Sequence, residues 1–426
     1  MSKRSKEKVK YLMNELIQAI EAGDLQTLNQ LLERFLMNEE PSAQYEAAEM
    51  LMHYGYLQQA KQVLENLQFI FPEEAQIKID LASVAMELDL EDEALEHLLS
   101  VHEEDAEYPQ ALVLLADYYQ MQGLYEVAER HINKALELLP TEPLLLFAKA
   151  ELLFETGRFT ESVRLYEELH SQQAEIAGVQ IAERLAEVYR AGGAYEQALT
   201  YYMETLEDKV TPDLLFGSAY SAFQIEKYEV AVTQLEDLKE LDPDYYSAYL
   251  LLAQSYAMLE DNKRALLAIE EGIARDEYDK SLYLFAGKMA LKTQDEEKAM
   301  NYLQQAIALD PEYMEATIVL MSVYAQREMY EEIIDLYESL QREDIEFTAI
   351  LPFVANAYNE AEKFEKANEI YTLAYTEYKE ESEFLEKYCY FLIEEGQQEK
   401  AKQIAEQLVL LEPTSEQWQA LLERFE

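Results

Sequence analysis

The sequence has few cysteines, glycines, prolines and basic residues. Its 426 residues include 1 cysteine, 11 glycines and 10 prolines, and 34 Lys and Arg residues stand against 86 Asp and Glu residues. The single cysteine, Cys389, excludes a disulfide within the chain and is typical of a protein in a reducing compartment. The formal net charge of −52 argues against nucleic acids and anionic membranes as partners, because both attract basic surfaces.

Long apolar runs are also missing. Residues 1–10 hold five basic residues, as the start of a signal peptide does, but polar residues such as Asn14 and Glu15 interrupt the segment that follows. The strongest apolar stretch, residues 144–154, contains two charged residues and is much shorter than a membrane-spanning helix. We therefore expect a soluble cytoplasmic protein, with residues 1–8 as a basic tail. This tail is either disordered, or it folds back on an acidic groove or contacts a second partner.

The scarce prolines show a regular spacing. Pro72 and Pro140 are 68 residues apart, and so are Pro243 and Pro311. Half of this distance, 34 residues, lies within the range of about 20–50 residues that is typical of solenoid repeats. With 49% hydrophobic residues the chain has enough material for a core, so the spacing predicts one continuous solenoid in place of several globular domains.

Small residues recur at two positions of a 34-residue unit. The units begin near Val9, Pro41, Ala75, Pro109, Pro143, Val179, Pro212, Tyr246, Lys280, Met314, Thr348 and Ser382. Position 8 holds Ala48, Ala82, Ala116, Ala150, Ala186, Ala219, Ala253, Gly287, Ala355 and Cys389. Position 20 holds Ala60, Ala94, Ala128, Ser162, Ala198, Ala231, Ala265, Ala299, Ala367 and Ala401, whereas Leu28 and Ile333 depart from this rule. One small residue on each helix is what two closely crossing helices require.

Glycine marks the turn between these helices. Position 15 holds Gly23, Gly55, Gly123, Gly157, Gly193 and Gly396, which are six of the eleven glycines. A left-handed glycine commonly ends a helix before the chain turns back.

These residues resemble the tetratricopeptide repeat (TPR). The clearest unit has Leu112, Leu115, Ala116, Tyr119, Gly123, Tyr125, Ala128, Ile132, Ala135 and Pro140 at the positions of the family pattern. Nearly the whole chain is similar to the long acidic YpiA-type TPR proteins of Gram-positive bacteria. The resemblance implies an all-α, right-handed α-solenoid of about 11–12 helix–turn–helix repeats. We expect a degenerate repeat at 9–40, the TPR solenoid at 41–415 and a C-terminal capping helix at 416–426.

Two segments break the period. Residues 172–178 contain two extra residues and no proline, which predicts either a hinge with altered stacking or only a longer loop. Residues 341–347 also lack the proline, and Pro352 falls inside the next expected first helix.

The sequence contains no pattern that is typical of catalysis or metal binding. His97 and His102 are five residues apart, which does not place them on one helical face. No zinc, calcium or phosphate-binding motif is present. We expect no enzyme, no metal and no cofactor, and Cys389 at the small position 8 is interpreted as a structural thiol.

The resemblance implies where a partner would bind. In the family, positions 2, 5, 9, 12 and 13 of the first helices line a concave wall. In four central repeats these positions give the candidate residues Val113, Asp117, Gln120, Phe147, Glu151, Phe154, Glu183, Glu187, Arg190, Phe216, Tyr220 and Phe223. Aromatic rings beside carboxylates bind apolar and basic groups. The alternative is that the phenylalanines only pack between helices.

These observations predict a scaffold or adaptor that binds a basic or amphipathic segment of a protein or peptide in an acidic-aromatic groove. The alternative is a peptide-sensing regulator whose solenoid becomes more compact when its ligand binds. The acidity serves either recognition or only solubility. Concave asparagines, by which peptide-sensing relatives hold backbone, are represented only by Asn356 and Asn359.

Overall fold

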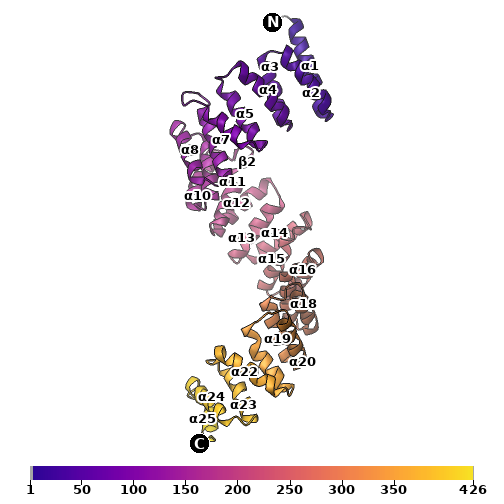
Figure 1. Ribbon diagram of the computed structural model, residues 1–426, viewed down its shortest axis with the longest axis vertical. Coiled ribbons are helices and arrows are strands. Elements are labelled where there is room, and N and C mark those ends of the chain that lie inside the picture. Colours follow the sequence, from indigo (N-terminus) through magenta and orange to yellow (C-terminus); the bar gives the residue numbers. More distant parts are fainter. Residues whose placement is uncertain (1–2, 426) are drawn as a thin grey trace. The chain divides into compact units, whose positions relative to one another are not determined.

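The computed structural model describes the backbone of residues 3–425 and the side chains of residues 12–425 (Figure 1). The chain forms two compact units, Met1–Val210 and Thr211–Glu426. Almost all regular structure in the described part of the chain is α-helical, which confirms the predicted all-α repeat solenoid. No helix among the described residues is long and apolar enough to cross a membrane.

The first unit contains twelve of the described helices and one short hairpin. Its elements are α1 (Lys3–Glu21), α2 (Leu25–Asn38), α3 (Pro41–His53), α4 (Leu57–Ile70), α5 (Ala75–Glu87), α6 (Glu91–Leu99), α7 (Tyr108–Met121), α8 (Tyr125–Leu138), α9 (Pro143–Glu155), α10 (Phe159–Gln172), β1 (Glu175–Ile176), β2 (Val179–Gln180), α11 (Ile181–Ala191) and α12 (Tyr195–Asp208). Helix α1 therefore includes most of the segment 1–8 that we predicted as a tail, and the side chains of residues 1–11 lie outside the described residues.

The second unit continues the same alternation of first and second helices. Its elements are α13 (Pro212–Gln224), α14 (Tyr228–Leu241), α15 (Ser247–Met258), α16 (Asn262–Arg275), α17 (Lys280–Lys292), α18 (Glu296–Leu309), α19 (Met314–Gln326), α20 (Tyr330–Arg342), the 3₁₀ turn η1 (Thr348–Ile350), α21 (Leu351–Glu360), α22 (Phe364–Tyr378), α23 (Ser382–Glu394), α24 (Gln398–Leu411) and α25 (Glu416–Glu423). Helix α25 packs on α24 and buries Trp418 and Leu421 at the end of the described chain.

The small residues at positions 8 and 20 lie at the helix crossings. All alanines that the sequence places at these positions, together with Ser162 and Cys389, are completely buried. At Gly287 an added Cβ would come within 2.8 Å of Leu303, so even a methyl group is too large there. Close packing without space for longer side chains therefore determines how each helix pair assembles.

One repeat of the second unit departs from this rule on both helices. Helix α19 carries Met321 at position 8, and α20 carries Ile333 at position 20. Both side chains are buried, and the backbones of α19 and α20 approach each other less closely than those of the other helix pairs in this unit. Two large residues at one crossing hold the helices further apart.

The turn between paired helices has one backbone conformation in every repeat. All six glycines at position 15 have positive φ angles. The other six repeats place Asp89, Glu226, Glu260, Gln294, Glu328 and Glu362 there, also with positive φ. The remaining positive φ angles among the described residues belong to Ala177, Gly178 and Asp344, which lie at the two period breaks.

The two breaks have different structures. At the first, β1 pairs antiparallel with β2, with Glu175 opposite Gln180 and Ile176 opposite Val179, and Ile176 is buried against the helices. The extra residues thus form a packed hairpin rather than an open loop. At the second, η1 replaces the first turn of the expected helix. Pro352 therefore lies in the first turn of α21, where it costs no hydrogen bond, and not inside the helix as we expected.

The left-handed turn allows a stability prediction. Glu260, with a φ of 62°, pays the steric cost of a Cβ in the left-handed region. We expect Glu260→Gly to raise the free energy of unfolding by about 1 kcal/mol, measured by urea denaturation followed by circular dichroism. Asn301→Gly, on the exposed face of α18, is the control and should lower it by about 0.3 kcal/mol. A loss of stability in Glu260→Gly would contradict the proposed strain.

Candidate functional site

The twelve predicted wall residues lie on four first helices. Helix α7 carries Val113, Asp117 and Gln120; α9 carries Phe147, Glu151 and Phe154; α11 carries Glu183, Glu187 and Arg190; α13 carries Phe216, Tyr220 and Phe223. The first nine belong to the first unit and the last three to the second. Asp117 is exposed and the other eleven are half-buried, so each keeps a surface that solvent can reach.

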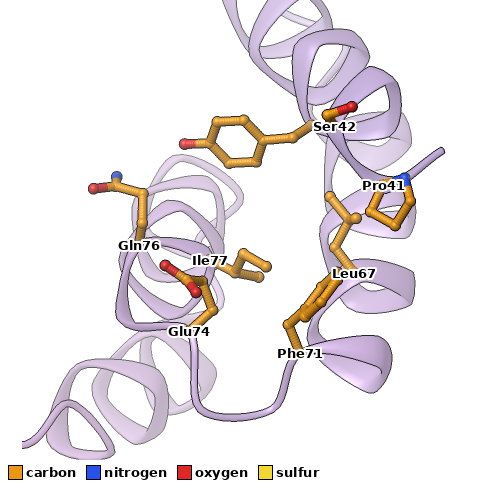
Figure 2. Close-up of a pocket in the computed structure, with 8 residues that line it drawn as sticks. Pro41, Ser42, Leu67, Phe71, Glu74, Gln76 and Ile77 are labelled. Atoms are coloured by element: carbon orange, nitrogen blue, oxygen red, sulfur yellow. The ribbon is translucent and has the colours of Figure 1, made fainter. Parts of the chain in front are cut away.

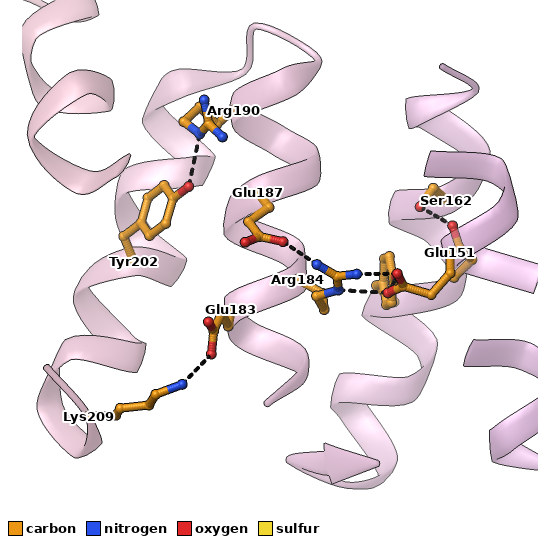
Figure 3. Close-up of polar contacts among 10 residues, drawn as sticks. Glu151, Ser162, Glu183, Arg184, Glu187, Arg190, Tyr202 and Lys209 are labelled. Atoms are coloured by element: carbon orange, nitrogen blue, oxygen red, sulfur yellow. Dashed lines mark hydrogen bonds and ion pairs between the residues drawn. The ribbon is translucent and has the colours of Figure 1, made fainter. Parts of the chain in front are cut away.

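An ion-pair network connects α9 with α11 (Figure 3). Arg184 donates from Nε to Glu151 Oε1 at 2.7 Å and from Nη2 to the other oxygen of Glu151, and its Nη1 donates to Glu187 at 2.5 Å. The hydroxyl of Tyr166 on α10 also donates to Glu151. Burial opposes the charge of Arg184, but the hydrogen bonds and charges of the two glutamates outweigh it and raise the pKa of Arg184. Two of the predicted carboxylates are therefore already neutralised in part.

Sequence reasoning missed Arg184, which holds this network together. It lies at position 6 of its repeat, and the family rule names only positions 2, 5, 9, 12 and 13. Two signals were available: Glu187 follows at i+3 on the same helix, and Glu151 lies one repeat earlier. In a chain so rich in glutamate, neither signal stands out.

Most other charged residues of the wall also have partners. Lys209 on the chain after α12 lies 3.4 Å from Glu183, and Arg190 Nε donates to the hydroxyl of Tyr202 at 3.0 Å (Figure 3). Asp117 has no hydrogen bond or ion pair with the described residues, and desolvation of its carboxylate by the neighbouring protein raises its pKa although part of the residue reaches solvent. The wall in the first unit is thus less acidic than the overall charge implies, and Asp117 is its unpaired carboxylate.

The aromatic residues combine packing with accessibility. Phe147 contacts Tyr166 edge-to-face with ring centroids 5.9 Å apart, and Phe154 contacts Phe159 at 6.1 Å. The guanidinium of Arg184 lies 6.0 Å from the centroid of Phe154. One face of each phenylalanine therefore packs against a neighbouring helix, as the alternative interpretation required, while another face stays accessible.

The second unit repeats this arrangement on α13. Phe216 lies 5.1 Å from Tyr245 and 6.5 Å from Tyr220, and Phe223 lies 5.4 Å from Tyr228, measured between ring centroids. Phe216 and Phe223 occupy the same repeat positions as Phe147 and Phe154, namely 5 and 12. Both helices thus present two half-buried rings two helical turns apart.

The first unit also contains a cavity of about 380 Å³ that the sequence did not indicate (Figure 2). It lies between α3, the end of α4 and the start of α5. The lining residues are Pro41, Ser42, Tyr45, Leu67, Phe71, Glu74, Gln76 and Ile77. At its edge Asp80 accepts hydrogen bonds from Tyr45 at 2.7 Å and from Gln76 at 2.8 Å, and burial raises the pKa of Asp80. The cavity is a mainly apolar surface with Glu74 in its lining and the carboxylate of Asp80 held at its edge.

The network around Arg184 allows a second prediction. Arg184 and Glu151 expose only 28% and 22% of their side chains, so Arg184→Met should leave partly buried carboxylates unpaired. We expect a loss of about 1–3 kcal/mol in the free energy of unfolding. Arg164→Met, at an exposed residue of α10, is the charge-matched control and should be nearly neutral. Adding Glu151→Gln to Arg184→Met should restore part of the lost free energy of unfolding. If the double variant is no more stable than Arg184→Met, the network does not act through charge.

Comparisons with known proteins agree with this repeat architecture. Models of YpiA-like tetratricopeptide repeats and of YpiA-like C-terminal tetratricopeptide repeats match residues 120–174 and 353–415, and general tetratricopeptide-repeat models match 216–281 and 281–313. TPR repeat-containing protein YpiA of Bacillus subtilis (strain 168) is 36% identical over 419 residues, 97% of this chain and 98% of YpiA.

Similar solved structures include YrrB, described as a TPR protein with an unusual peptide-binding site, with 21% identity over 43% of this chain and 95% of that one and a TM-score of 0.38. Another is the C-terminal part of a TPR protein from Cytophaga hutchinsonii. It has 17% identity over 55% of this chain and 96% of that one, and a TM-score of 0.48. The identity to YpiA over almost its full length is the decisive finding: the chain belongs to the YpiA family of tetratricopeptide-repeat proteins.

Proposed function

We propose that this chain is a non-enzymatic cytoplasmic scaffold or adaptor that binds a basic or amphipathic segment of a partner protein on the inner faces of its first helices. TPR proteins in general mediate contacts between proteins, and the family of this chain is defined by such repeats. The observation that carries the proposal is the recurrence of two half-buried phenylalanines, at positions 5 and 12, on both α9 and α13.

The spacing of these rings favours a peptide ligand. Positions 5 and 12 are seven residues apart, which places Phe147 and Phe154 on one face of α9, about 10 Å apart along its axis. Side chains three residues apart in a polyproline II segment, or seven apart in a helix, lie on one face and span a similar distance of about 10 Å. Two apolar side chains of a partner segment can therefore contact both rings of one helix at once.

Charge contributes in two ways. The net charge of −52 attracts basic segments over long distances and accelerates encounter at low salt. At short range most carboxylates of the wall are paired, so the unpaired Asp117 is the group that can pair with a basic residue beside the rings. We therefore assign affinity mainly to the rings and the salt dependence to the surrounding field.

The rings provide the test of this proposal. A full-length variant with Phe147, Phe154, Phe216 and Phe223 all replaced by serine should capture the main partner from native cytosol at least tenfold less, because buried aromatic anchors dominate binding energy. Leu138→Ser on second helix α8, where the leucine is 49% exposed, is the matched control. Circular dichroism verifies that helicity is kept. Unchanged capture by the folded quadruple variant would refute the assignment.

A second candidate function is peptide sensing, which the half-buried Asn356 at a concave position of α21 favours. A bound peptide would then make the solenoid more compact and reduce its radius of gyration. Small-angle X-ray scattering with and without peptide fractions of the native cytosol measures this change. A radius of gyration that stays constant while a peptide is bound would identify the protein as a static scaffold.

A further inference from the structure

A cavity of about 480 Å³ lies in the second unit, where the repeat is irregular. Residues of the first helices α19, α21 and α23 form most of its lining, together with residues of α22 and of the turn that follows it. Helix α21 has 10 residues where α19 and α23 have 13, because η1 replaces its first turn. The cavity thus borders both the shortened helix and the widely spaced pair α19–α20.

Aromatic rings form a large part of the cavity wall. Phe384 lies 5.9 Å from Tyr371 and 5.7 Å from Tyr378, measured between ring centroids, and Phe353 lines the cavity from α21. Tyr371 is only 1% exposed, yet its hydroxyl has no hydrogen-bond partner among the described residues. Burial, with a smaller contribution from nearby carboxylates, raises the pKa of Tyr371. The small exposed part of Tyr371 leaves its hydroxyl outside the buried polar atoms that lack a partner, so this hydroxyl is open to a polar ligand in the cavity.

Two polar residues of the cavity, Asn356 and Glu381, have side chains without a partner among the described residues. Asn356 on α21 is half-buried, and its side-chain amide makes no hydrogen bond with the described residues. Glu383 pairs with Lys387 at 3.2 Å, so these two charges compensate each other. The carboxylate of Glu381 forms no ion pair in the described part of the chain, and its charge raises the pKa of Tyr378 after the larger effect of burial. The carboxylate of Glu381, two side-chain amides and two half-buried rings are therefore available to a ligand; the amides belong to Gln326 and Asn356, and the rings to Phe353 and Tyr378.

We propose that this cavity binds an arginine side chain from the segment of the partner protein, together with the residues next to it. The guanidinium stacks on the half-buried ring of Tyr378, and its N–H groups donate to the carboxylate of Glu381 and to the amide oxygen of Asn356. The aliphatic part of the arginine contacts Phe353. The planar group of arginine meets these partners better than the point charge of lysine. The volume of about 480 Å³ exceeds one side chain and lies within the usual range of ligand sites, about 300–1,000 Å³.

This inference rests on the proposed function, since it names one recognition site for the partner segment. It differs in location, because the ring residues of α9 and α13 do not line this cavity. It also differs in chemistry, because it requires a cation and not only apolar anchors.

A peptide series tests the proposal with the full-length protein. The probe is a short fluorescein-labelled peptide, capped at both ends, with one arginine among alanine, leucine and serine residues. Replacement of this arginine by citrulline keeps the shape and removes the charge. Fluorescence polarisation should show at least about tenfold weaker binding of the citrulline peptide, as expected for loss of charge-assisted hydrogen bonds, and weaker binding of a lysine peptide.

Variants locate the effect in the cavity. Glu381→Gln should bind the arginine and citrulline peptides almost equally, whereas Glu380→Gln, at the exposed neighbouring residue, should keep the difference between them. Tyr371→Phe, which retains the ring, should weaken binding of the arginine peptide less than Glu381→Gln does. Equal affinity of the unmodified protein for both peptides, no binding of the arginine peptide, or an unaffected Glu381→Gln variant would overturn the proposal.

The two proposals can fail separately. If partner capture depends on the four phenylalanines but Glu381→Gln changes neither capture nor peptide preference, the arginine site is wrong and the scaffold function stands. If the quadruple serine variant still captures the partner, the groove assignment is wrong whatever the peptides show.

Discussion

The close crossing of two helices within each repeat is the interaction on which the rest of this structure depends. Alanine at positions 8 and 20 is completely buried in repeat after repeat, because the backbones leave space for a methyl group and little more. Polar substitutes are accepted only with a partner: Ser162 Oγ donates to the carbonyl oxygen of Ala150 at 2.8 Å, and Cys389 Sγ to that of Ala401 at 3.5 Å. Burial raises the pKa of Cys389 to about 11, which keeps the thiol protonated and unreactive.

This crossing also decides which side chains remain available for function. Each first helix uses one face for its own partner helix, and the residues on its other faces contact the neighbouring repeats or the solvent. On the first helices that carry the candidate residues, nearby basic side chains reduce the negative charge of the surface. Arg184 and Lys209 compensate carboxylates that appear free in the sequence, while Asp117 stays unpaired. A net charge of −52 therefore describes the field at a distance better than the chemistry of the wall.

The two breaks in the period show how an irregular repeat can be either filled or left open. At the first, a left-handed Ala177-Gly178 turn allows a tight hairpin, and the apolar side chain of Ile176 enters the core. At the second, residues 343–347 supply no comparable hairpin, and α21 begins late. The chain there passes from α20 to a 3₁₀ turn, and a cavity lies beside it. Similar losses of register thus produced a packed element in one unit and a candidate binding site in the other.

The amino-acid sequence by itself determined the repeat, because small residues at a helix crossing and a left-handed residue at a turn are local steric requirements. It also indicated which first helices carry the aromatic rings. Tertiary structure decided the pairing of Arg184 with Glu151 one repeat away, the start of α21 and the cavity beside Glu381. These features depend on which of many similar carboxylates lies near a given base, and on how two adjacent repeats stack. In a chain with 86 acidic residues, only the packed structure distinguishes the paired ones from the free ones.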